Sequence, residues 1–212
     1  MQKLIRLSAI IFATLVGIIG NLLIPAFASA QTIQWSGPRP TENLVGDQPG
    51  AVPSADEEAL PAEYRRQMVF FRTTEAPGTI IVHTQERFLY LVLGNNRALR
   101  YGIGVGREGF QWSGLKRIVR KAEWPDWVPP PEMIERQPYL PRFMAGGPGN
   151  PLGARALYIG GTVYRVHGTN QPETIGSAVS SGCFRLVNPD VIDLYDRVPV
   201  GTKVIVVQGA GL

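Results

Sequence analysis

Short runs of β-branched and aromatic residues, separated by turn signals, dominate the chain from Thr79 onward. The runs TIIVH (Thr79–His83), RFLYLVL (Arg87–Leu93) and ALRYGIGV (Ala98–Val105) are typical of strands, and the tripeptides TQE and GNN between them are typical of turns. Strand-like runs of this length with turns this close together predict a meander of β-hairpins. The chain is therefore expected to be rich in β-structure.

Further strands are predicted toward the C-terminus. ALYI (Ala156–Ile159) and TVYRVH (Thr162–His167) flank a Gly160-Gly161 turn and predict another hairpin. KVIVVQ (Lys203–Gln208) predicts a buried closing strand. KRIVRK (Lys116–Lys121) predicts a strand or strand end with solvated charges, and a patch for an anionic ligand is the alternative.

One helix is predicted, in the segment NPDVIDLYDRV. Asn188 suits the N-cap, Pro189 the first helical position and Asp190 the positive end of the helix dipole. Aliphatic and aromatic residues then recur on one face at helical spacing, as core packing would require. These residues are Val191, Leu194, Tyr195 and Val198.

The segment from Glu123 to Gly153 is rich in proline, so the sequence predicts no regular helix or strand there. A long loop in a compact domain is usually functional or disordered. Its aromatic residues need something to pack against, which argues against disorder. These are Trp124, Trp127, Tyr139 and Phe143. We expect the segment to be a lid or a wall of a substrate cleft.

The N-terminus predicts export. Lys3 and Arg6 precede a mostly apolar run, Leu7–Ile24, and the small residues Ala28-Ser29-Ala30 follow it. This pattern predicts a cleaved signal peptide over residues 1–30. An uncleaved membrane anchor is the alternative, because the apolar run is nearly long enough to span a bilayer. In both cases the rest of the chain lies in the periplasm or cell envelope, with membrane contact through this segment alone.

Residues 31–63 are rich in Pro, Gly and acids, and they contain one base against six acids. This composition predicts a flexible linker of formal charge −5, with a short helix at Ala55–Leu60. Residues 64–212 then form one domain of formal charge +7. A basic domain attracts polyanions, and in an exported protein a carboxylate-rich polymer such as peptidoglycan is a better partner than nucleic acid. An ordinary solvated surface is the alternative.

Cys183 is the only cysteine, so it cannot form an intramolecular disulfide. It is a buried inert thiol, one half of an intermolecular disulfide, or a reactive group. A catalytic thiol needs a base or a positive field beside it. His167 ends a predicted strand before a glycine, and the loop-like segment up to Cys183 lets the chain return to it. His83 is better explained as a packed or surface histidine.

The neighbours of Cys183 fit a nucleophile. Gly182 lets the backbone come close to a substrate, and the amides of Gly182 and Cys183 are candidate donors to an oxyanion. Arg185 lies on the same side of an extended segment as Cys183, where it can lower the pKa of the thiol and bind a carboxylate. A salt bridge from Arg185 to Asp190 or Asp193 of the predicted helix is the alternative.

HGT (His167–Thr169) followed by SSGCFRLVN (Ser180–Asn188) resembles the signature of the L,D-transpeptidase catalytic domain family. That signature reads His-Gly-Thr, a spacer, then Ser-His-Gly-Cys-x-Arg-x-x-Asn. WPDWVPPPEM and GGPGNPLGARALYI also resemble segments of the family's envelope members, and the likeness covers roughly Tyr64 to Val207. One position departs from the signature: Ser181 stands where the family most often has a histidine.

The resemblance implies a mainly β fold, a β-sandwich of mixed strands, with a short helix after the catalytic Cys and the long loop over the cleft. It also implies that Cys183 attacks a peptidoglycan tetrapeptide stem, that D-alanine leaves with a proton from His167, and that an amine resolves the thioester. That amine is the diaminopimelate of another stem or a lipoprotein lysine. The candidate oxyanion contacts are Gly182, Cys183 and Gly168, and the candidate substrate-binding residues are Arg185, Ser181, Thr169 and Asn188.

Two other functions stay open at this stage. An L,D-carboxypeptidase shares the same acylation step and differs only in using water as the acceptor. A non-catalytic wall-binding domain with a vestigial thiol is the alternative outside catalysis. No cofactor and no metal is expected, because one cysteine and two histidines far apart in the chain form no ligand cluster. The group that orients His167 is expected to be a backbone carbonyl or another neutral group.

Overall fold

The structure is a computed structural model that describes residue 50 and residues 60–209. The predicted signal peptide and all but Leu60 of the predicted helix Ala55–Leu60 lie outside the described residues. Within the described range, no helix has both the length and the apolar character needed to cross a bilayer.

The described residues are mostly strands, with two α-helices and two short 3-10 helices. In chain order the elements are η1 Ala62–Tyr64, β1 Gln67–Phe70, β2 Ile80–His83, β3 Phe88–Gly94, β4 Arg97–Gly102, β5 Val105–Gly106, β6 Gly114–Glu123, α1 Pro131–Arg136, β7 Arg155–Ile159, β8 Arg165–His167, η2 Pro172–Thr174, β9 Ala178–Ser180, β10 Phe184–Arg185, α2 Asn188–Arg197 and β11 Lys203–Val207.

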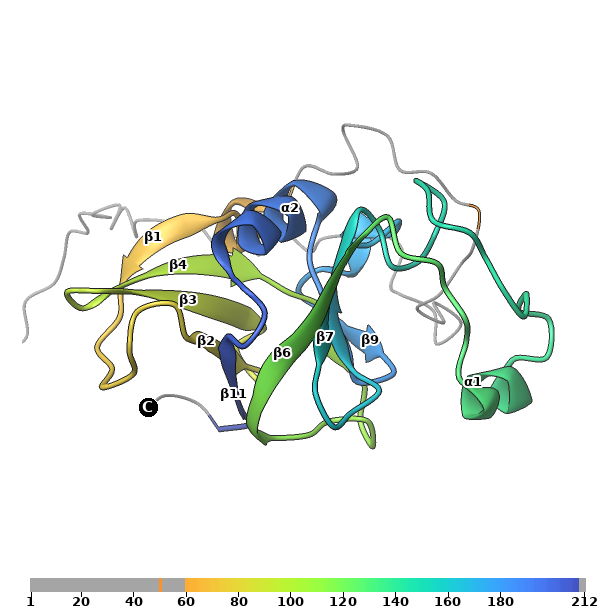
Figure 1. The fold of residues 1–212 in the computed structure, drawn as a ribbon, viewed down its shortest axis with the longest axis horizontal. Coiled ribbons are helices and arrows are strands. Elements are labelled where there is room, and N and C mark those ends of the chain that lie inside the picture. Colours follow the sequence, from red (N-terminus) through yellow and green to blue (C-terminus); the bar gives the residue numbers. More distant parts are fainter. Residues whose placement is uncertain (1–49, 51–59, 210–212) are drawn as a thin grey trace, which may run out of the picture. The chain divides into compact units, whose positions relative to one another are not determined.

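Nine of these strands form one mixed sheet in the order β1-β4-β3-β2-β11-β6-β7-β8-β10, and β5 pairs with β9 in a separate ribbon (Figure 1). Strands β2, β3 and β4 are the predicted antiparallel meander. The turn between β3 and β4 places Asn95 at φ 51° and Asn96 at φ 54°, the left-handed conformation that favours Asn in tight hairpins. Strand β11 runs parallel to β2, and β10 runs parallel to β8.

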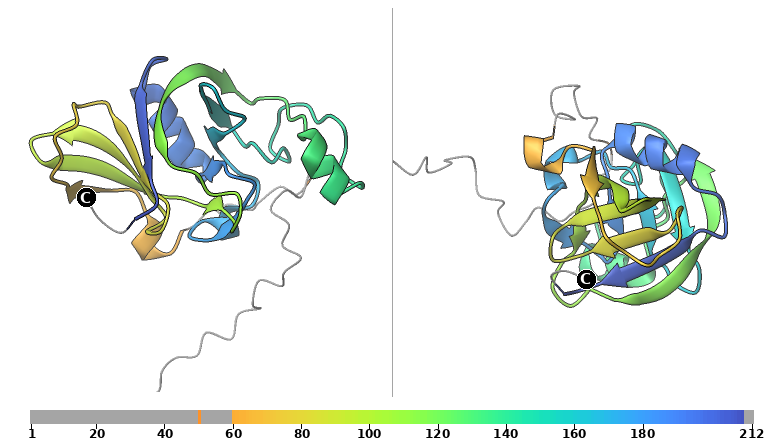
Figure 2. Two further views of the ribbon diagram at one scale, coloured as in Figure 1. Left: turned by 90° about the horizontal axis from the view of Figure 1, so that it is seen from below. Right: turned by 90° about the vertical axis from the view of Figure 1, so that its left-hand side faces the viewer.

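Strand β6 joins the two halves of the sheet. Its first residues, Gly114–Arg117, pair with β11, and its later residues, from Ile118 to Glu123, pair with β7. The register is irregular between Ile118 and Arg120, where the strand changes partners. Figure 2 shows the long strand β6 between the β1–β4 side and the β7–β10 side of the domain.

The core lies between these two halves and α2. It contains residues of β2, β3 and β4 together with residues of β7, β8 and β10. Helix α2 contributes Val191 and Leu194, and Val198 follows at its C-cap; each is at most 1% exposed, so the apolar face predicted for this helix is the one that packs. The predicted mainly β fold, a sandwich of mixed strands with a short helix after the cysteine, is confirmed.

Three local predictions are wrong. Helix α2 begins at Asn188 itself, with Val187 as its N-cap, because the Asn188 side chain bonds to two other segments rather than to the helix. The proline-rich loop contains a regular element, α1, whose prolines stand at its start, where a missing N–H costs nothing. The segment between His167 and Cys183, predicted to be loop, includes η2 and β9.

The aromatic residues of the proline-rich loop do not all pack as expected. Trp127 is 2% exposed, whereas Trp124, Tyr139 and Phe143 are 42%, 73% and 56% exposed. The loop is ordered instead by a small core of its own and by one amide. Asn150 Nδ2 donates to carbonyl oxygens of the loop at 3.0 to 3.2 Å, and Trp127 and Met144 exchange two backbone hydrogen bonds of 2.8 Å. The loop is therefore ordered, and four of its residues line one side of the cavity described below.

Candidate active site

The pleat of β8 and β10 places the candidate catalytic residues on one face of the sheet. His167 and Arg185 are Cα partners in this parallel pair, as are Val166 and Phe184. Val166 and Phe184 point into the core, so His167 and Arg185 point to the opposite face. Cys183 stands two residues before Arg185 and shares that face, as predicted for an extended segment.

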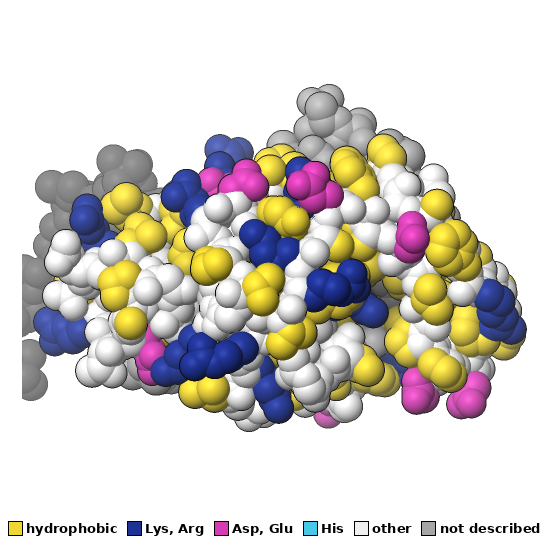
Figure 3. Space-filling view, in the orientation of Figure 1, with side chains coloured by type: hydrophobic (Ala, Val, Ile, Leu, Met, Phe, Trp, Pro, Cys, Tyr) yellow, Lys and Arg dark blue, Asp and Glu magenta, His cyan; other side chains and the backbone are white. Residues whose placement is uncertain are grey.

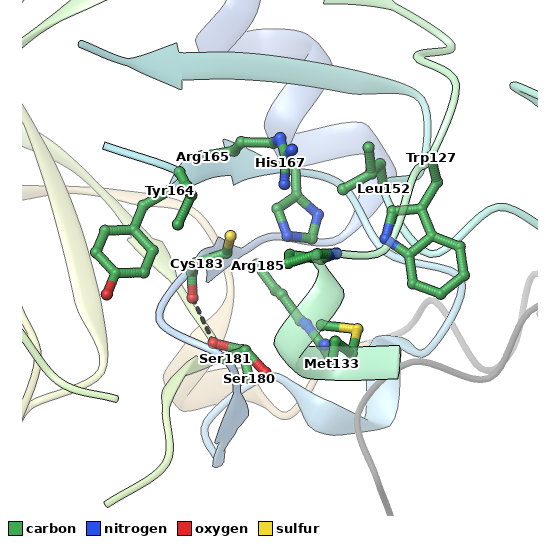
Figure 4. A pocket seen from close by; sticks show the side chains of 12 residues that line it. Trp127, Met133, Leu152, Tyr164, Arg165, His167, Ser180, Ser181, Cys183 and Arg185 are labelled. Carbon is green, nitrogen blue, oxygen red and sulfur yellow. Dashed lines mark hydrogen bonds between the residues drawn. The ribbon is translucent and has the colours of Figure 1, made fainter. Parts of the chain in front are cut away.

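These side chains open into one cavity of about 40 Å³ (Figure 4). Figure 4 shows the Cys183 sulfur on the side of its residue that faces the His167 ring. The remaining lining residues are Trp127, Pro130, Met133 and Leu152 from the proline-rich loop, Val163, Tyr164 and Arg165 from β8 and the turn before it, and Ser180 and Ser181 from the cysteine segment. A cavity of this size holds a few water-sized groups, which suits one reacting group of a longer substrate.

A backbone carbonyl orients His167. Nδ1 of the ring lies 2.6 Å from the carbonyl oxygen of Gly168, which can only accept, so Nδ1 carries the proton in this contact. Nε2 is then the nitrogen that can take a proton from a nucleophile. The expectation of a neutral orienting group, rather than a carboxylate, agrees with this contact.

The His167 imidazole is neutral in this environment. Its pKa is lowered from 6.5 to about 3, first by burial and then by the positive charges of Arg185 and Arg165. The carbonyls of Gly168 and Leu152 act in the opposite direction but are smaller influences. A neutral imidazole at physiological pH is the form that can act as a general base.

The turn that carries Cys183 is held by three contacts. Ser180 Oγ donates to the carbonyl of Cys183 at 2.7 Å and accepts from the Gly182 N–H at 3.2 Å. The Trp112 indole N–H donates to the carbonyl of Gly182 at 3.0 Å, and its ring stacks on Tyr164 with 5.2 Å between centroids. The sequence analysis gave no role to Ser180, Trp112 or Tyr164. The contacts of Trp112 with Gly182 and Tyr164 join segments far apart in the chain, whereas those of Ser180 lie within its own turn.

Gly182 has no room for a side chain. Its φ is 102°, and an added Cβ would overlap the ring of Tyr164 and lie 3.0 Å from the Phe110 carbonyl oxygen. Glycine is therefore required both by conformation and by packing. The sequence predicts close approach of a substrate at Gly182; the structure adds close approach of the Tyr164 ring and the Phe110 carbonyl.

Thr169 and Asn188 are not among the residues that line the cavity. Asn188 Oδ1 accepts from the Ala154 N–H at 2.9 Å, and Asn188 Nδ2 donates to the Thr169 carbonyl at 3.1 Å. Thr169 Oγ1 accepts from the Gln171 N–H at 3.0 Å. Both side chains support the loop after His167, and the direct substrate contacts expected for these two residues stay a prediction.

Two of the three candidate oxyanion donors are engaged within the protein. The Gly182 N–H donates to Ser180 Oγ, and the Gly168 N–H donates to the Arg155 carbonyl at 3.0 Å.

His83 lies away from the site. It is 2% exposed and packs edge-on against Phe71 and Tyr90, so of the two expected alternatives, a packed or a surface histidine, it is the packed one.

Known proteins similar to this chain include L,D-transpeptidases. The YkuD family profile, described as the L,D-transpeptidase catalytic domain, matches residues 77–206. The chain belongs to this family. Among curated relatives of this L,D-transpeptidase domain, the probable L,D-transpeptidase ErfK/SrfK of Escherichia coli (strain K12) is 37% identical over 148 residues, covering 67% of this chain and 47% of that protein. The chain thus spans about half the length of the curated relatives it matches.

One solved structure of an L,D-transpeptidase agrees at the level of the fold. The Ldtfm–avibactam carbamoyl enzyme has a TM-score of 0.50 at 18% identity, covering 64% of this chain and 50% of that chain. A structure from Brucella melitensis, described as a probable carnitine operon oxidoreductase caia, is 49% identical over 73% of this chain and 100% of that chain, with a TM-score of 0.47. That description belongs to the Brucella protein and is not transferred to this L,D-transpeptidase family member.

Proposed function

We propose that this domain is a cysteine-dependent L,D-transpeptidase acting on the tetrapeptide stems of peptidoglycan. The observation that carries the proposal is the shared cavity, in which the Cys183 thiol, the neutral imidazole of His167 and the guanidinium of Arg185 meet. Acyl transfer requires a nucleophile, a base beside it, and a third group that orients the base.

In the acylation step, the sulfur of Cys183 attacks the carbonyl carbon of the amide between the L-centre and the terminal D-alanine. The thiol proton passes to Nε2 of His167. When the tetrahedral intermediate collapses, the C–N bond breaks and the imidazolium gives its proton to the leaving amine of D-alanine. The product is a thioester on Cys183 and a neutral His167.

The oxyanion of the intermediate needs a hydrogen-bond donor. The candidate donors are the backbone N–H groups of Gly182, Cys183 and Gly168, and those of Gly182 and Gly168 bond to Ser180 Oγ and to the Arg155 carbonyl in the protein without substrate. Arg185, which is 2% exposed and lines the cavity, then binds the carboxylate of the stem. Ser181 also lines the cavity, at the position where the family most often has a histidine.

In the second step an amine attacks the thioester carbonyl, His167 takes the amine proton, and the sulfur leaves to regain it. The proposed acceptor is the diaminopimelate of another stem or a lipoprotein lysine, and the predicted export signal would place the reaction in the periplasm or envelope. Water in place of the amine would make the same domain an L,D-carboxypeptidase.

Intact-mass spectrometry of the purified domain with tetrapeptide stems, with and without an added D-amino acid, tests the proposal. We expect a covalent adduct on Cys183 and an exchanged tetrapeptide. Cys183→Ala is the control, and it should bind sacculi but form no adduct. Accumulation of tripeptide alone would assign a carboxypeptidase, and a wild-type protein without any adduct would leave a wall-binding domain.

A further inference from the structure

A row of side chains continues from the cavity across three strands of the sheet. Arg165 of β8 lines the cavity, its register partner on β7 is Tyr158, and the partner of Tyr158 on β6 is Arg120. Directly paired residues share a face, so all three side chains lie on the outer face that carries His167 and Cys183. Because neighbouring strands are about 4.8 Å apart, the row spans roughly 10 Å from β8 to β6.

The aromatic ring of Tyr158 lies between the two guanidinium groups. The Arg120 Cζ atom is 3.5 Å from the ring centroid, and the Arg165 Cζ atom is 5.4 Å from it. Two cations this near each other repel, and a shared aromatic ring offsets part of that repulsion while leaving the planar N–H edges available. Figure 3 shows Lys and Arg side chains on the surface over β6 and β7.

Within residues 60–209, neither Arg120 nor Arg165 forms an ion pair with a carboxylate, in contrast to Arg66, Arg155 and Arg197. Arg66 contacts Asp193 at 3.1 Å, Arg155 contacts Glu123 at 3.3 Å, and Arg197 contacts Asp193 at 2.9 Å. Arg165 Nε is also buried with no hydrogen-bond partner among the described residues. A buried donor without a partner is costly unless a ligand satisfies it.

We propose that Arg165 and Arg120, with Tyr158 between them, form a subsite for a substrate carboxylate next to the catalytic cavity. The inference rests on the proposed function, because it names the substrate class of the same site: a peptide with a free carboxylate close to the scissile amide, as diaminopimelate provides. Arg165 makes the direct contact with the carboxylate, since it lines the cavity. Arg120 adds positive charge from β6, on the other side of β7.

In this proposal Arg185 and Arg165 bind different carboxylates of the substrate. Arg185 comes from β10 beside the nucleophile, and Arg165 comes from β8 two residues before His167. Guanidinium groups bind carboxylates through paired N–H donors, so each can hold one carboxylate. The domain would therefore discriminate between a stem whose diaminopimelate carboxylate is free and one in which it is amidated, since the amide offers no negative charge.

Two synthetic stem peptides, identical except for a free or an amidated diaminopimelate carboxylate, test this subsite. The first readout is equilibrium binding to the full-length Cys183→Ala protein, which needs no turnover. The second is kcat/KM for acylation of the protein with an intact Cys183. We expect the carboxylated peptide to bind about 10-fold more tightly, and we expect Arg165→Gln to remove most of that preference while leaving the amidated peptide almost unaffected.

Three variants sharpen the comparison. Arg165→Lys keeps the charge and should restore part of the preference, and Arg120→Gln should reduce it by a smaller factor. Arg117→Gln is the matched control, because Arg117 is an exposed arginine of the same strand whose guanidinium bonds to the Gly201 carbonyl. It should leave the preference unchanged. Any effect of these changes on His167 acts on both peptides and cancels in their ratio.

The outcomes separate the subsite from the enzyme activity. Equal binding of the two peptides, or a preference that survives Arg165→Gln, overturns the subsite even if both peptides are turned over. A binding preference that Arg165→Gln abolishes supports the subsite even if neither peptide forms a thioester, in which case the proposed transpeptidase reaction fails instead.

Discussion

His167 and Arg185 are register partners on the parallel strands β8 and β10, so a buried imidazole and a buried guanidinium lie side by side on one face of the sheet. This arrangement opposes protonation of the imidazole, because a second positive charge beside the arginine is unfavourable. We infer that a substrate carboxylate on Arg185 would compensate that charge. The imidazolium needed during acylation would then form most easily when substrate is bound.

The first prediction concerns the charge of His167. Arg185→Gln should raise the pKa of His167 from about 3, because the arginine is the largest electrostatic cause of the lowering. The value should stay below the ordinary 6.5, since burial is the largest cause and remains. NMR titration of the imidazole in a Cys183→Ala background measures this. Arg165→Gln should produce a smaller rise, and an unchanged titration in Arg185→Gln would contradict the assignment.

A second prediction follows for stability in acid. Because the pKa of His167 is lower in the folded protein than in the unfolded chain, only the unfolded chain binds this proton between pH 6.5 and about 3. The free energy of unfolding attributable to this group therefore falls as the pH drops through that window, by up to about 1.4 kcal/mol per pH unit. Above pH 6.5 both states are neutral and the contribution is flat.

Chemical denaturation of wild type and His167→Asn across this window provides the measurement. The comparison uses the difference between the two proteins in the slope of unfolding free energy against pH, because Asp190 changes the stability of both in the opposite direction. Burial raises the pKa of Asp190 to about 6, so the folded protein binds that proton first, and its contribution falls as the pH rises through about 4 to 6. Parallel curves for the two proteins would rule out a buried neutral His167.

Ser180 is the subject of the third prediction. Its hydroxyl satisfies both the Cys183 carbonyl and the Gly182 N–H, so Ser180→Ala leaves two backbone groups of the nucleophile turn without their partner. We expect a loss of about 1 to 3 kcal/mol in the free energy of unfolding and slower thioester formation. Ser181→Ala is the matched control, because Ser181 is more exposed, and it should cost less than about 0.5 kcal/mol. Equal losses in both variants would remove the special role of Ser180.

Local sequence pattern was enough to predict the strands of the meander and the packed face of α2. Alternation and turn residues act within a hairpin, so TIIVH and RFLYLVL predict β2 and β3 within one or two residues. Helix α1 was missed because a count of prolines ignores where in a helix they stand. Strand β9 was missed because its three residues pair with β5, which lies far away in sequence.

The candidate site divides in the same way. Cys183, His167 and Arg185 could be predicted, because the motif spacing and the two-residue alternation place them together. Trp112 could not, since its hydrogen bond to Gly182 joins residues 70 positions apart and no local pattern marks it. The row from Arg165 to Arg120 also depends on the registers of three strands, which short strands do not specify by themselves.

The last prediction separates strain from packing at Gly182. Gly182→Ala should cost about 3 kcal/mol or more, because φ is 102° and the new methyl group would overlap the Tyr164 ring. Gly161→Ala is the matched control: its φ of 68° is also left-handed, but its Cβ would meet only the end of Lys116 at 4.0 Å. That variant should lose about 1 kcal/mol and form the thioester at the wild-type rate.

The double variant Gly182→Ala/Tyr164→Ala decides how the cost is divided. If the overlap with the ring is the main cause, removing the ring should recover part of the stability, and the two changes will not add. Thioester formation should remain slow, because Tyr164 also stacks on the Trp112 ring whose indole N–H holds the Gly182 carbonyl. Strict additivity of the two losses would show instead that backbone strain alone demands glycine beside the nucleophile.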